Sequence, residues 1–236
     1  MSVHLLSEKI MFPSPESAEE DGLLAVGGDL SEKRLLLAYS MGIFPWYSEG
    51  FPILWWSPDP RLVLIPGELR VSRSLSQTIR KGLFSVTMDN AFQEVINRCS
   101  KVRRNKEEGT WITPKMIEAY IRLHDSGYAH SVESWYGGEL AGGLYGVSLG
   151  GAFFGESMFA ERADASKVAF VQLVRNLSRW GYRFIDCQIT TSHLINFGAR
   201  EMPRREFLSL LKDALNTPTQ GGKWNRFSGE EIETQQ

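Results

Sequence analysis

The stretch from Gly42 to Arg61 constrains the fold of this chain more than any other segment. It holds six aromatic residues and four of the ten prolines, all but Phe51 and Pro52 in the runs Gly42-Ile43-Phe44-Pro45-Trp46-Tyr47 and Ile53-Leu54-Trp55-Trp56-Ser57-Pro58-Asp59-Pro60-Arg61. Proline fixes φ, lacks an N–H donor and keeps the residue before it out of the helical region. The backbone is therefore expected to run as extended pieces joined by turns, without a regular helix.

Two interpretations of these aromatic rings are open. Aromatic side chains are core residues first, so the rings fit the core of a small N-terminal module. Trp46 and Tyr47 stand next to a proline and to the polar turn Ser48-Glu49-Gly50. That setting favours an exposed platform for stacking.

Composition sets limits on the partners and on the compartment. The chain has 236 residues, 42% of them apolar, and a formal net charge of -2, so any contact with nucleic acid must use a local basic patch. Residues 1–22 are partly acidic and include no long apolar run, so neither a signal peptide nor a membrane span is expected. We expect a cytoplasmic protein in which Cys99 and Cys187 are free thiols.

The N-terminal part is predicted to form a separate small domain. Residues 22–29 have the glycines of a turn, and Ser31 can cap a short helix that ends before Gly42. A boundary is expected near Pro66, which gives an N-terminal domain over residues 1–66 and a second domain over 67–236. The polar tail from about residue 216 is expected to be loosely structured despite Trp224.

The second domain has a regular order of predicted elements. A strand is predicted over 84–88, then a helix capped by Asp89 or Asn90, and then a helix that starts at Thr113-Pro114. Three strands follow over 128–135, 139–147 and 152–159, and glycine pairs at their turns favour antiparallel pairing. A helix after Asp164, a strand over 182–189 and a helix over 203–215 complete a β-β-β-α-β order within an α+β fold.

Several longer motifs resemble one known family. The chain is similar to the bacterial leucyl/phenylalanyl-tRNA–protein transferases over nearly its whole length, in the two runs quoted above and in Gly22-Leu23-Leu24-Ala25-Val26-Gly27-Gly28-Asp29-Leu30, Glu108-Gly109-Thr110-Trp111-Ile112-Thr113, Gly155-Glu156-Ser157-Met158-Phe159, Ala165-Ser166-Lys167 and Ile185-Asp186-Cys187-Gln188. These motifs are long and unusual in composition. The resemblance implies a GNAT-like acyltransferase domain with a mixed, mainly antiparallel sheet flanked by helices, behind the small N-terminal domain.

The junction before the long predicted helix argues against coenzyme A as the acyl donor. An acetyl-CoA enzyme holds pyrophosphate on backbone N–H groups of a glycine-rich turn at the start of a helix. Here the junction over residues 160–167 has no glycine and two acidic residues, Glu161 and Asp164. We therefore expect no coenzyme A. The aminoacyl ester that the resemblance implies as donor is already activated, so no other cofactor is expected.

Asp186 and Gln188 lie two apart in a predicted strand, so both side chains are expected on one face and Ile185, Cys187 and Ile189 on the other. A satisfied structural network is one interpretation, because buried polar groups normally have partners. The resemblance implies instead that the pair lies at the reaction centre. Gln188 would then accept a hydrogen bond from the attacking amine, and Asp186 would orient and polarise its amide.

The resemblance also implies binding roles for other residues. Glu156 would pair with a basic acceptor side chain, although a surface glutamate on a strand is the simpler interpretation. Core packing is the simpler one for the residues that would form the aminoacyl pocket, Leu144, Phe153, Met158 and Ile185. Trp46 and Trp111 would flank the 3′ adenosine of tRNA. Phosphates of the tRNA would contact Arg73, Arg80 and Lys81, while the charge run over 101–108 is expected to be solvated.

The function implied is transfer of Leu or Phe, and less well Met, from aminoacyl-tRNA to proteins that begin with Arg or Lys. The product would be marked for degradation through its N-terminal residue. Leu-tRNA and Phe-tRNA are the expected donors, and a monomer without a membrane partner is expected. Two alternatives are a related transferase with another acceptor, such as a cell-wall peptide, and a non-catalytic RNA-binding protein.

Two further patterns are weaker. Gly146-Val147-Ser148-Leu149-Gly150 matches the hydrolase motif G-x-S-x-G, and Asp186 and His193 follow in the order of a triad. A nucleophile elbow leads from a strand into a helix, whereas this serine precedes a glycine turn into another predicted strand. The four histidines lack ligand spacing, so no metal is expected.

Overall fold

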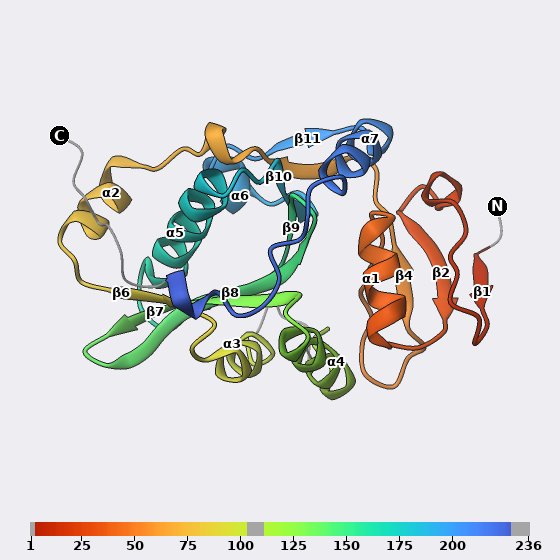
Figure 1. Ribbon diagram of the computed structural model, residues 1–236, viewed down its shortest axis with the longest axis horizontal. Coiled ribbons are helices and arrows are strands. Elements are labelled where there is room, and N and C mark those ends of the chain that lie inside the picture. The colour runs from red at the N-terminus through yellow and green to blue at the C-terminus, as the bar shows by residue number, and fades with distance from the viewer. Residues whose placement is uncertain (1–2, 103–110, 228–236) are drawn as a thin grey trace.

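Two β-sheets, one of four strands and one of seven, organise the chain in the computed structural model of Figure 1. The structure describes residues 3–102 and 111–227. Most of the charge run expected to be solvated, residues 103–108, and the last part of the polar tail, residues 228–236, lie outside the described residues.

The four-stranded sheet belongs to the N-terminal part and has the order β1-β2-β4-β3. β1 pairs parallel with β2 and the other neighbours pair antiparallel. Its strands and the helix beside it are β1 (His4–Leu6), β2 (Leu23–Gly27), β3 (Phe44–Pro45), β4 (Leu54–Trp56) and α1 (Glu32–Ser40), after a 3-10 turn η1 (Pro15–Ser17). Ser31 caps α1 by accepting the N–H of Arg34, as expected.

The prediction of a turn over residues 22–29 is wrong for most of this segment. Leu24 and Ala25 are buried in β2 between two neighbouring strands, which neither could be on an exposed turn. Only the glycines at the two ends, Gly22 and Gly27-Gly28, have the positive φ of turn residues.

The proline-aromatic stretch is extended, as expected, and its rings divide between core and surface. Trp55 is fully buried, packs edge-on against Phe12 at 4.8 Å and donates its indole N–H to the carbonyl of Gly27. Trp46 is 39% exposed. Tyr47 is buried, and its hydroxyl lies 3.1 Å from Oγ1 of Thr113. The interpretation of Tyr47 as an exposed platform is therefore wrong, because its ring packs into the contact with the second domain.

The seven-stranded sheet has the order β11-β5-β10-β9-β8-β7-β6. All neighbours pair antiparallel except β9 and β10, which are parallel. Its strands are β5 (Arg61–Leu64), β6 (Ser85–Met88), β7 (Ala129–Tyr136), β8 (Glu139–Leu149), β9 (Ala152–Ala160), β10 (Phe184–Gln188) and β11 (Arg200–Met202). The expected α+β class with a mixed, mainly antiparallel sheet is confirmed.

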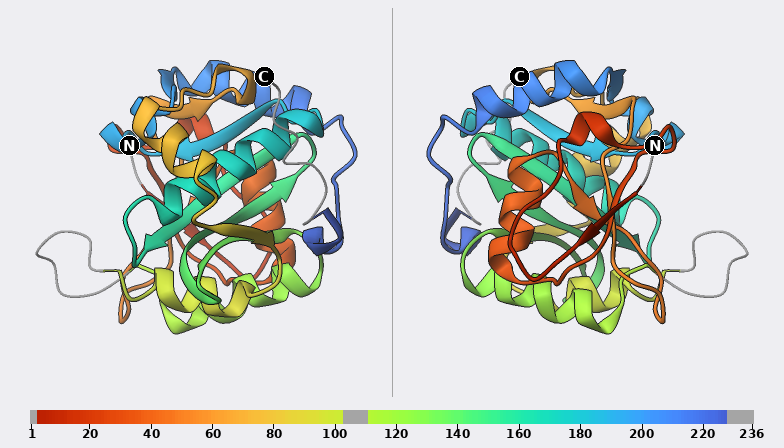
Figure 2. Two further views of the ribbon diagram at one scale, coloured as in Figure 1. Left: turned by 90° about the vertical axis from the view of Figure 1, so that its left-hand side faces the viewer. Right: turned by 90° about the vertical axis from the view of Figure 1, so that its right-hand side faces the viewer.

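Helices cover both faces of this sheet (Figures 1 and 2). α3 (Phe92–Cys99) and α4 (Pro114–Asp125) lie on one face, and α5 (Ala165–Arg179) lies on the other, with α2 (Arg73–Arg80) near its start. α6 (Ser192–Asn196) follows β10, and α7 (Arg204–Ala214) packs beside β5. Thr113 caps α4 as expected, and the β-β-β-α-β order is confirmed.

β5 lies before the boundary expected near Pro66 but pairs with β10 and β11 of the larger sheet. Pro66 itself begins a short 3-10 turn, η2 (Pro66–Glu68). The strand Arg61–Leu64 therefore groups with the second sheet, because its backbone donors and acceptors are used there. No helix among the described residues is long and apolar enough to cross a membrane.

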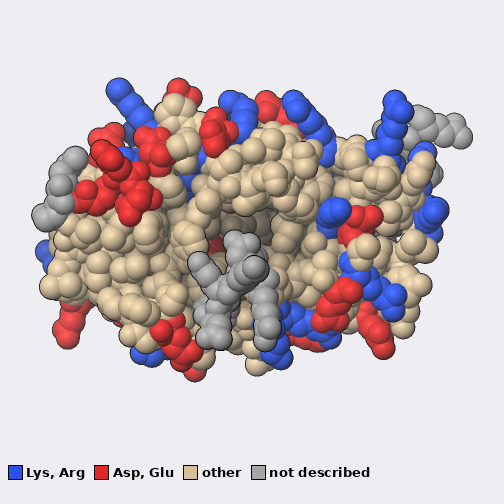
Figure 3. All heavy atoms as spheres, turned by 180° about the vertical axis from the view of Figure 1, so that it is seen from behind, with Lys and Arg blue, Asp and Glu red and all other residues tan. Residues whose placement is uncertain are grey.

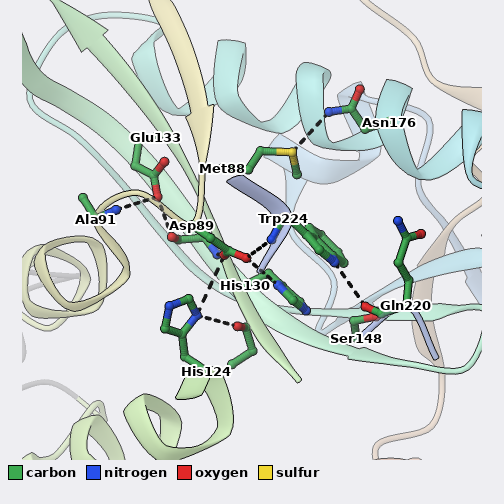
Figure 4. A network of polar contacts seen from close by, with 12 residues as sticks. Met88, Asp89, Ala91, His124, His130, Glu133, Ser148, Asn176, Gln220 and Trp224 are labelled. Atoms are coloured by element: carbon green, nitrogen blue, oxygen red, sulfur yellow. Dashed lines mark hydrogen bonds and ion pairs between the residues drawn. The ribbon is translucent and has the colours of Figure 1, made fainter. Parts of the chain in front are cut away.

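The tail after α7 is not loose as far as residue 227. It runs past the turn between β8 and β9, where Oγ1 of Thr219 accepts the N–H of Gly150, to a last 3-10 turn, η3 (Trp224–Phe227). Trp224 is fully buried there (Figure 4). The indole stacks on His130 at 3.7 Å with an angle of 4° between the planes. The main-chain N–H of Trp224 donates to Oδ2 of Asp89 at 2.7 Å.

Asp89 is used for this contact and not as a helix cap. Its carboxylate also accepts the N–H of Ser131 and contacts Nδ1 of His130 at 2.8 Å (Figure 4). α3 begins after Ala91 without a side-chain cap. The expected cap is wrong because the buried tail and β7 use both carboxylate oxygens.

Candidate active site

β9 and β10 pair over only three residues, and a cavity opens where they separate. Phe184, Ile185 and Asp186 pair with residues 152–154. Beyond this point a bulge interrupts the pairing of β10 with β5, and Gln188 has a left-handed φ of 61°. A cavity of about 420 Å³ lies between the diverging strands. The molecule is visibly hollowed near the middle of the face in Figure 3.

The cavity brings together residues that are far apart in the sequence. All four expected pocket residues, Leu144, Phe153, Met158 and Ile185, line it. α5 adds Phe170 and Leu173, so most of the wall is apolar. Trp46, Trp111, Glu156 and Gln188 line the same cavity. The structure therefore places one apolar chamber beside two polar groups and two tryptophans.

Asp186 lies behind the cavity and not in its wall. The carboxylate is fully buried and accepts Nε–H and Nη2–H of Arg61 at 2.8 and 2.7 Å. Oδ1 also accepts the main-chain N–H of Gln188 at 2.9 Å. Because of the bulge, Ile185 and Cys187 line the cavity together with Gln188, and the strict alternation expected for this strand fails.

Glu156 is a buried carboxylate at the centre of a polar network. Its Oε1 accepts the hydroxyl of Tyr39 at 2.8 Å and the side-chain N–H of Gln188 at 2.8 Å. Its Oε2 accepts the hydroxyl of Tyr120 at 3.0 Å. Burial raises the pKa of Glu156 to about 7, and the nearby charge of Asp186 adds to that shift, while these three hydrogen bonds oppose it. The interpretation as a surface glutamate is wrong.

The proton count of this network explains why a neutral carboxyl fits. The hydroxyls of Tyr39 and Tyr120 also contact each other, so the two phenols and Glu156 form a closed ring of three oxygen contacts. Burial raises the pKa of both tyrosines well above 10, so each keeps its single proton. Two phenol protons that both point to Glu156 leave the contact between the tyrosines without a proton. When Glu156 is protonated, one phenol can donate to the other instead and accept the carboxyl proton, so that all three contacts are hydrogen bonds.

The expected tRNA-contacting residues fall in two places. Trp46 and Trp111 line the cavity. The ring of Trp46 lies 5.9 Å from that of Trp56, whose indole N–H donates to the main-chain carbonyl of Trp46 at 2.7 Å. Exposed cations lie on or just after α2, outside the cavity wall: Arg73, Arg80 and Lys81.

Comparisons with known proteins identify the family of this chain. The profile described as leucyl/phenylalanyl-tRNA protein transferase matches residues 63–212, and the profile of the N-terminal domain of that transferase matches residues 28–59. The chain is 61% identical to the "Leucyl/phenylalanyl-tRNA--protein transferase" of Anaeromyxobacter sp. (strain Fw109-5), with 98% of both chains covered. The protein of the same name from Myxococcus xanthus (strain DK1622) is 58% identical, with 95% of this chain and 97% of the other covered. The chain belongs to this family.

Solved structures add little to this assignment. The structure of L-PGS from Bacillus licheniformis aligns with a TM-score of 0.39 at 11% identity and covers 72% of this chain. The alignment spans 54% of that chain, about half its length. A likeness of this size has no weight for function. The membership expected from the sequence motifs, and with it an aminoacyltransferase, is confirmed by the sequence comparisons.

Several residues of the candidate site were not predicted from the sequence. Arg61 adjoins the Asp186–Gln188 pair, Tyr39 and Tyr120 hold Glu156, and the cavity is further lined by Phe170, Leu173, Thr191, His193 and Leu194. Tyr39 and Tyr120 lie in the apolar stripes of two helices, where a core position is the ordinary expectation. Their only distinguishing signal is a hydroxyl that needs a partner once it is buried.

The hydrolase pattern does not form a site in this transferase. Ser148 is fully buried in β8, and its hydroxyl lies 2.6 Å from that of Tyr182. Asp186 is paired with Arg61 instead. Burial raises the pKa of the Cys187 thiol far above its usual range, so it is a poor nucleophile. At the start of α5, Asp164 pairs with Lys167 at 2.8 Å, which puts a carboxylate where a pyrophosphate would need donors.

Proposed function

We propose that this transferase moves Leu or Phe, and less readily Met, from aminoacyl-tRNA to the α-amino group of proteins that begin with Arg or Lys. The observation that supports this most is the apolar cavity of about 420 Å³ that ends at Gln188 and Glu156. An aminoacyl ester is already activated, so attack by an amine on its carbonyl carbon forms a peptide bond without ATP. The bond to the ribose oxygen breaks, and one proton passes from nitrogen to that oxygen.

The donor fits the cavity by shape. Leu144, Phe153, Met158 and Ile185 would surround an unbranched or γ-branched side chain such as Met, Leu or Phe. Trp46 and Trp111 would stack on the terminal adenine, a contact worth about 1–3 kcal/mol per base. The exposed cations of α2 would hold phosphates of the acceptor stem, without preference for sequence.

Catalysis would come mainly from holding the two reactants together. Correct placement alone can supply up to roughly 7–11 kcal/mol of a barrier in ideal cases. The side-chain nitrogen of Gln188 donates to Glu156, so its amide oxygen is the end that would accept a hydrogen bond from the attacking amine. A neutral amide is too weak a base to take the proton fully, so Gln188 would align the amine while the ribose hydroxyls carry the proton away.

Glu156 would recognise the basic side chain of the acceptor. The carboxyl lines the cavity and is buried, so a cation that reaches it meets little competition from water. In the ring with Tyr39 and Tyr120, before any acceptor binds, about half of the Glu156 carboxyls are protonated near pH 7. Arrival of a guanidinium or ammonium favours the ionised form, so binding of the acceptor would release a proton.

The pH dependence of acceptor binding tests this role of Glu156. An Arg-starting peptide, measured without donor, should bind about tenfold more tightly at pH 8 than at pH 6, because the ionised fraction of a group with a pKa near 7 rises about tenfold between them. Glu156→Gln should bind weakly at both pH values, with a raised KM for the acceptor. Unchanged affinity in this variant, or a flat pH profile in the wild type, would rule the role out.

The cellular setting belongs to the same proposal. Charged tRNA and newly exposed protein N-termini meet in the cytoplasm, where we place the protein as a monomer. Products with N-terminal Leu or Phe would then be marked for degradation.

A product assay separates the proposed function from its alternatives. The chain is incubated with labelled Phe-tRNA and one of three acceptors: an Arg-starting peptide, the same peptide starting with Ala, and a cell-wall muropeptide. Mass spectrometry of the products should show Phe joined to the Arg peptide only. Transfer to the muropeptide alone would indicate a different acceptor class, and binding of tRNA without any product would indicate an RNA-binding protein.

A further inference from the structure

We propose that Arg61 is a positioning residue for the transfer reaction. It acts on Gln188 through Asp186 and the main chain. This inference rests on the proposed function, because it concerns the amide that would align the amine. No motif or comparison assigns such a role to Arg61. Three features of the structure support it.

The first feature is the geometry of the pair. Arg61 binds Asp186 through two parallel hydrogen bonds of 2.8 and 2.7 Å, and both side chains are essentially inaccessible to solvent. Two-point pairing fixes the orientation of the carboxylate as well as its distance, which a single ammonium cannot do. Asp186 is therefore held in one orientation on β10.

The second feature is the way in which Arg61 itself is held. Its guanidinium lies 4.8 Å from the ring centre of Phe44 and 4.6 Å from that of Phe207. Phe44 belongs to β3 of the N-terminal sheet, and Phe207 belongs to α7. The cation thus lies between two elements that approach β10 from different parts of the chain, so it joins the N-terminal sheet to the strand that ends at the cavity.

The third feature is a hydrogen bond between Asp186 and the main chain of Gln188. Oδ1 accepts the main-chain N–H of Gln188, which has a left-handed φ of 61°. A glutamine in that conformation needs support, because residues with a Cβ seldom adopt it. The Gln188 amide itself contacts Glu156. Asp186 therefore directs the amide toward the cavity by fixing the backbone, and does not polarise it directly.

The test measures how much Arg61→Lys lowers kcat in two backgrounds, the otherwise wild-type chain and the Gln188→Ala variant. Lysine keeps the charge that Asp186 needs but loses the two-point pairing. We expect kcat to fall at least about tenfold in the wild type, since misplacement of a reacting group by about 1 Å costs up to about 100-fold. The KM for donor tRNA should stay within about twofold, because the wall of the cavity is untouched.

In the Gln188→Ala background, Arg61→Lys should lower the remaining kcat less than about threefold, because the amide it positions is gone. An equal loss in both backgrounds, or a wild-type kcat for Arg61→Lys, would overturn the proposal. Asp186→Asn provides the same comparison if Arg61→Lys does not fold. Transfer by the wild-type chain in the same assay tests the proposed function separately.

Arg34→Lys is a matched control for a purely structural effect. Arg34 is also fully buried and ion-paired, to Asp29 at 3.2 Å, but it lies in the N-terminal part and does not line the cavity. Its replacement should lower the melting temperature while leaving kcat unchanged. A fall in kcat as large as that of Arg61→Lys would show that general loosening explains both, and would also overturn the proposal.

Discussion

Met158→Trp should lower kcat/KM for Phe transfer by roughly 10- to 150-fold. Met158 lines the apolar cavity and is only half-buried, so a larger side chain can enter the cavity without displacing the core. Burial of an apolar side chain such as that of Phe is worth about 1.5–3 kcal/mol, and the indole would occupy the space in which this burial takes place. Steady-state kinetics with Phe-tRNA and an Arg-starting peptide measure the effect.

Met158→Leu is the control for this substitution. It nearly conserves volume, so the chamber keeps its size and kcat/KM should stay within about threefold of the wild type. The melting temperatures of both variants should stay close to that of the wild type. Wild-type transfer of Phe by Met158→Trp would show that the acyl side chain does not enter this cavity.

Trp224→Ala should destabilise the protein by about 3–5 kcal/mol, the usual cost of truncating a buried Trp. The indole is fully buried and stacked on His130, next to the Asp89 network that joins the tail to β6 and β7. Urea denaturation followed by circular dichroism measures the change in the free energy of unfolding.

Phe51→Ala is the matched aromatic control for the tail. Phe51 is 69% exposed, so its removal should change the free energy of unfolding by less than about 0.5 kcal/mol. Equal urea midpoints for Trp224→Ala and the wild type would contradict the view that the tail as far as Trp224 belongs to the folded core.

Local sequence patterns predicted the elements, because their causes are local. Ser31 and Thr113 cap helices from within one turn, and proline excludes a helix from the stretch before β4. The antiparallel strands β7, β8 and β9 follow from alternation and from glycine turns. The cavity-lining residues came from the resemblance to the family, since their pattern alone equally fits core packing.

Contacts between distant residues could not be predicted in this way. Arg61 and Asp186 are 125 positions apart, and Asp89 and Trp224 are 135 apart. The bulge at Gln188 also cannot be read from its neighbours, because a strand pattern favours strict alternation. The tail was predicted to be loosely structured because its composition is polar. Burial of one indole, that of Trp224 stacked on His130, outweighs that composition.

The turnover of Gln188→Ala tests the central claim most directly. The kcat is measured at saturating Phe-tRNA and Arg-starting peptide. Binding of the peptide without donor is followed in parallel. If the amide aligns the amine against the ester, kcat should fall about 100-fold, the cost of a misplaced reacting group, while the peptide still binds. A wild-type kcat with intact peptide binding would contradict the account.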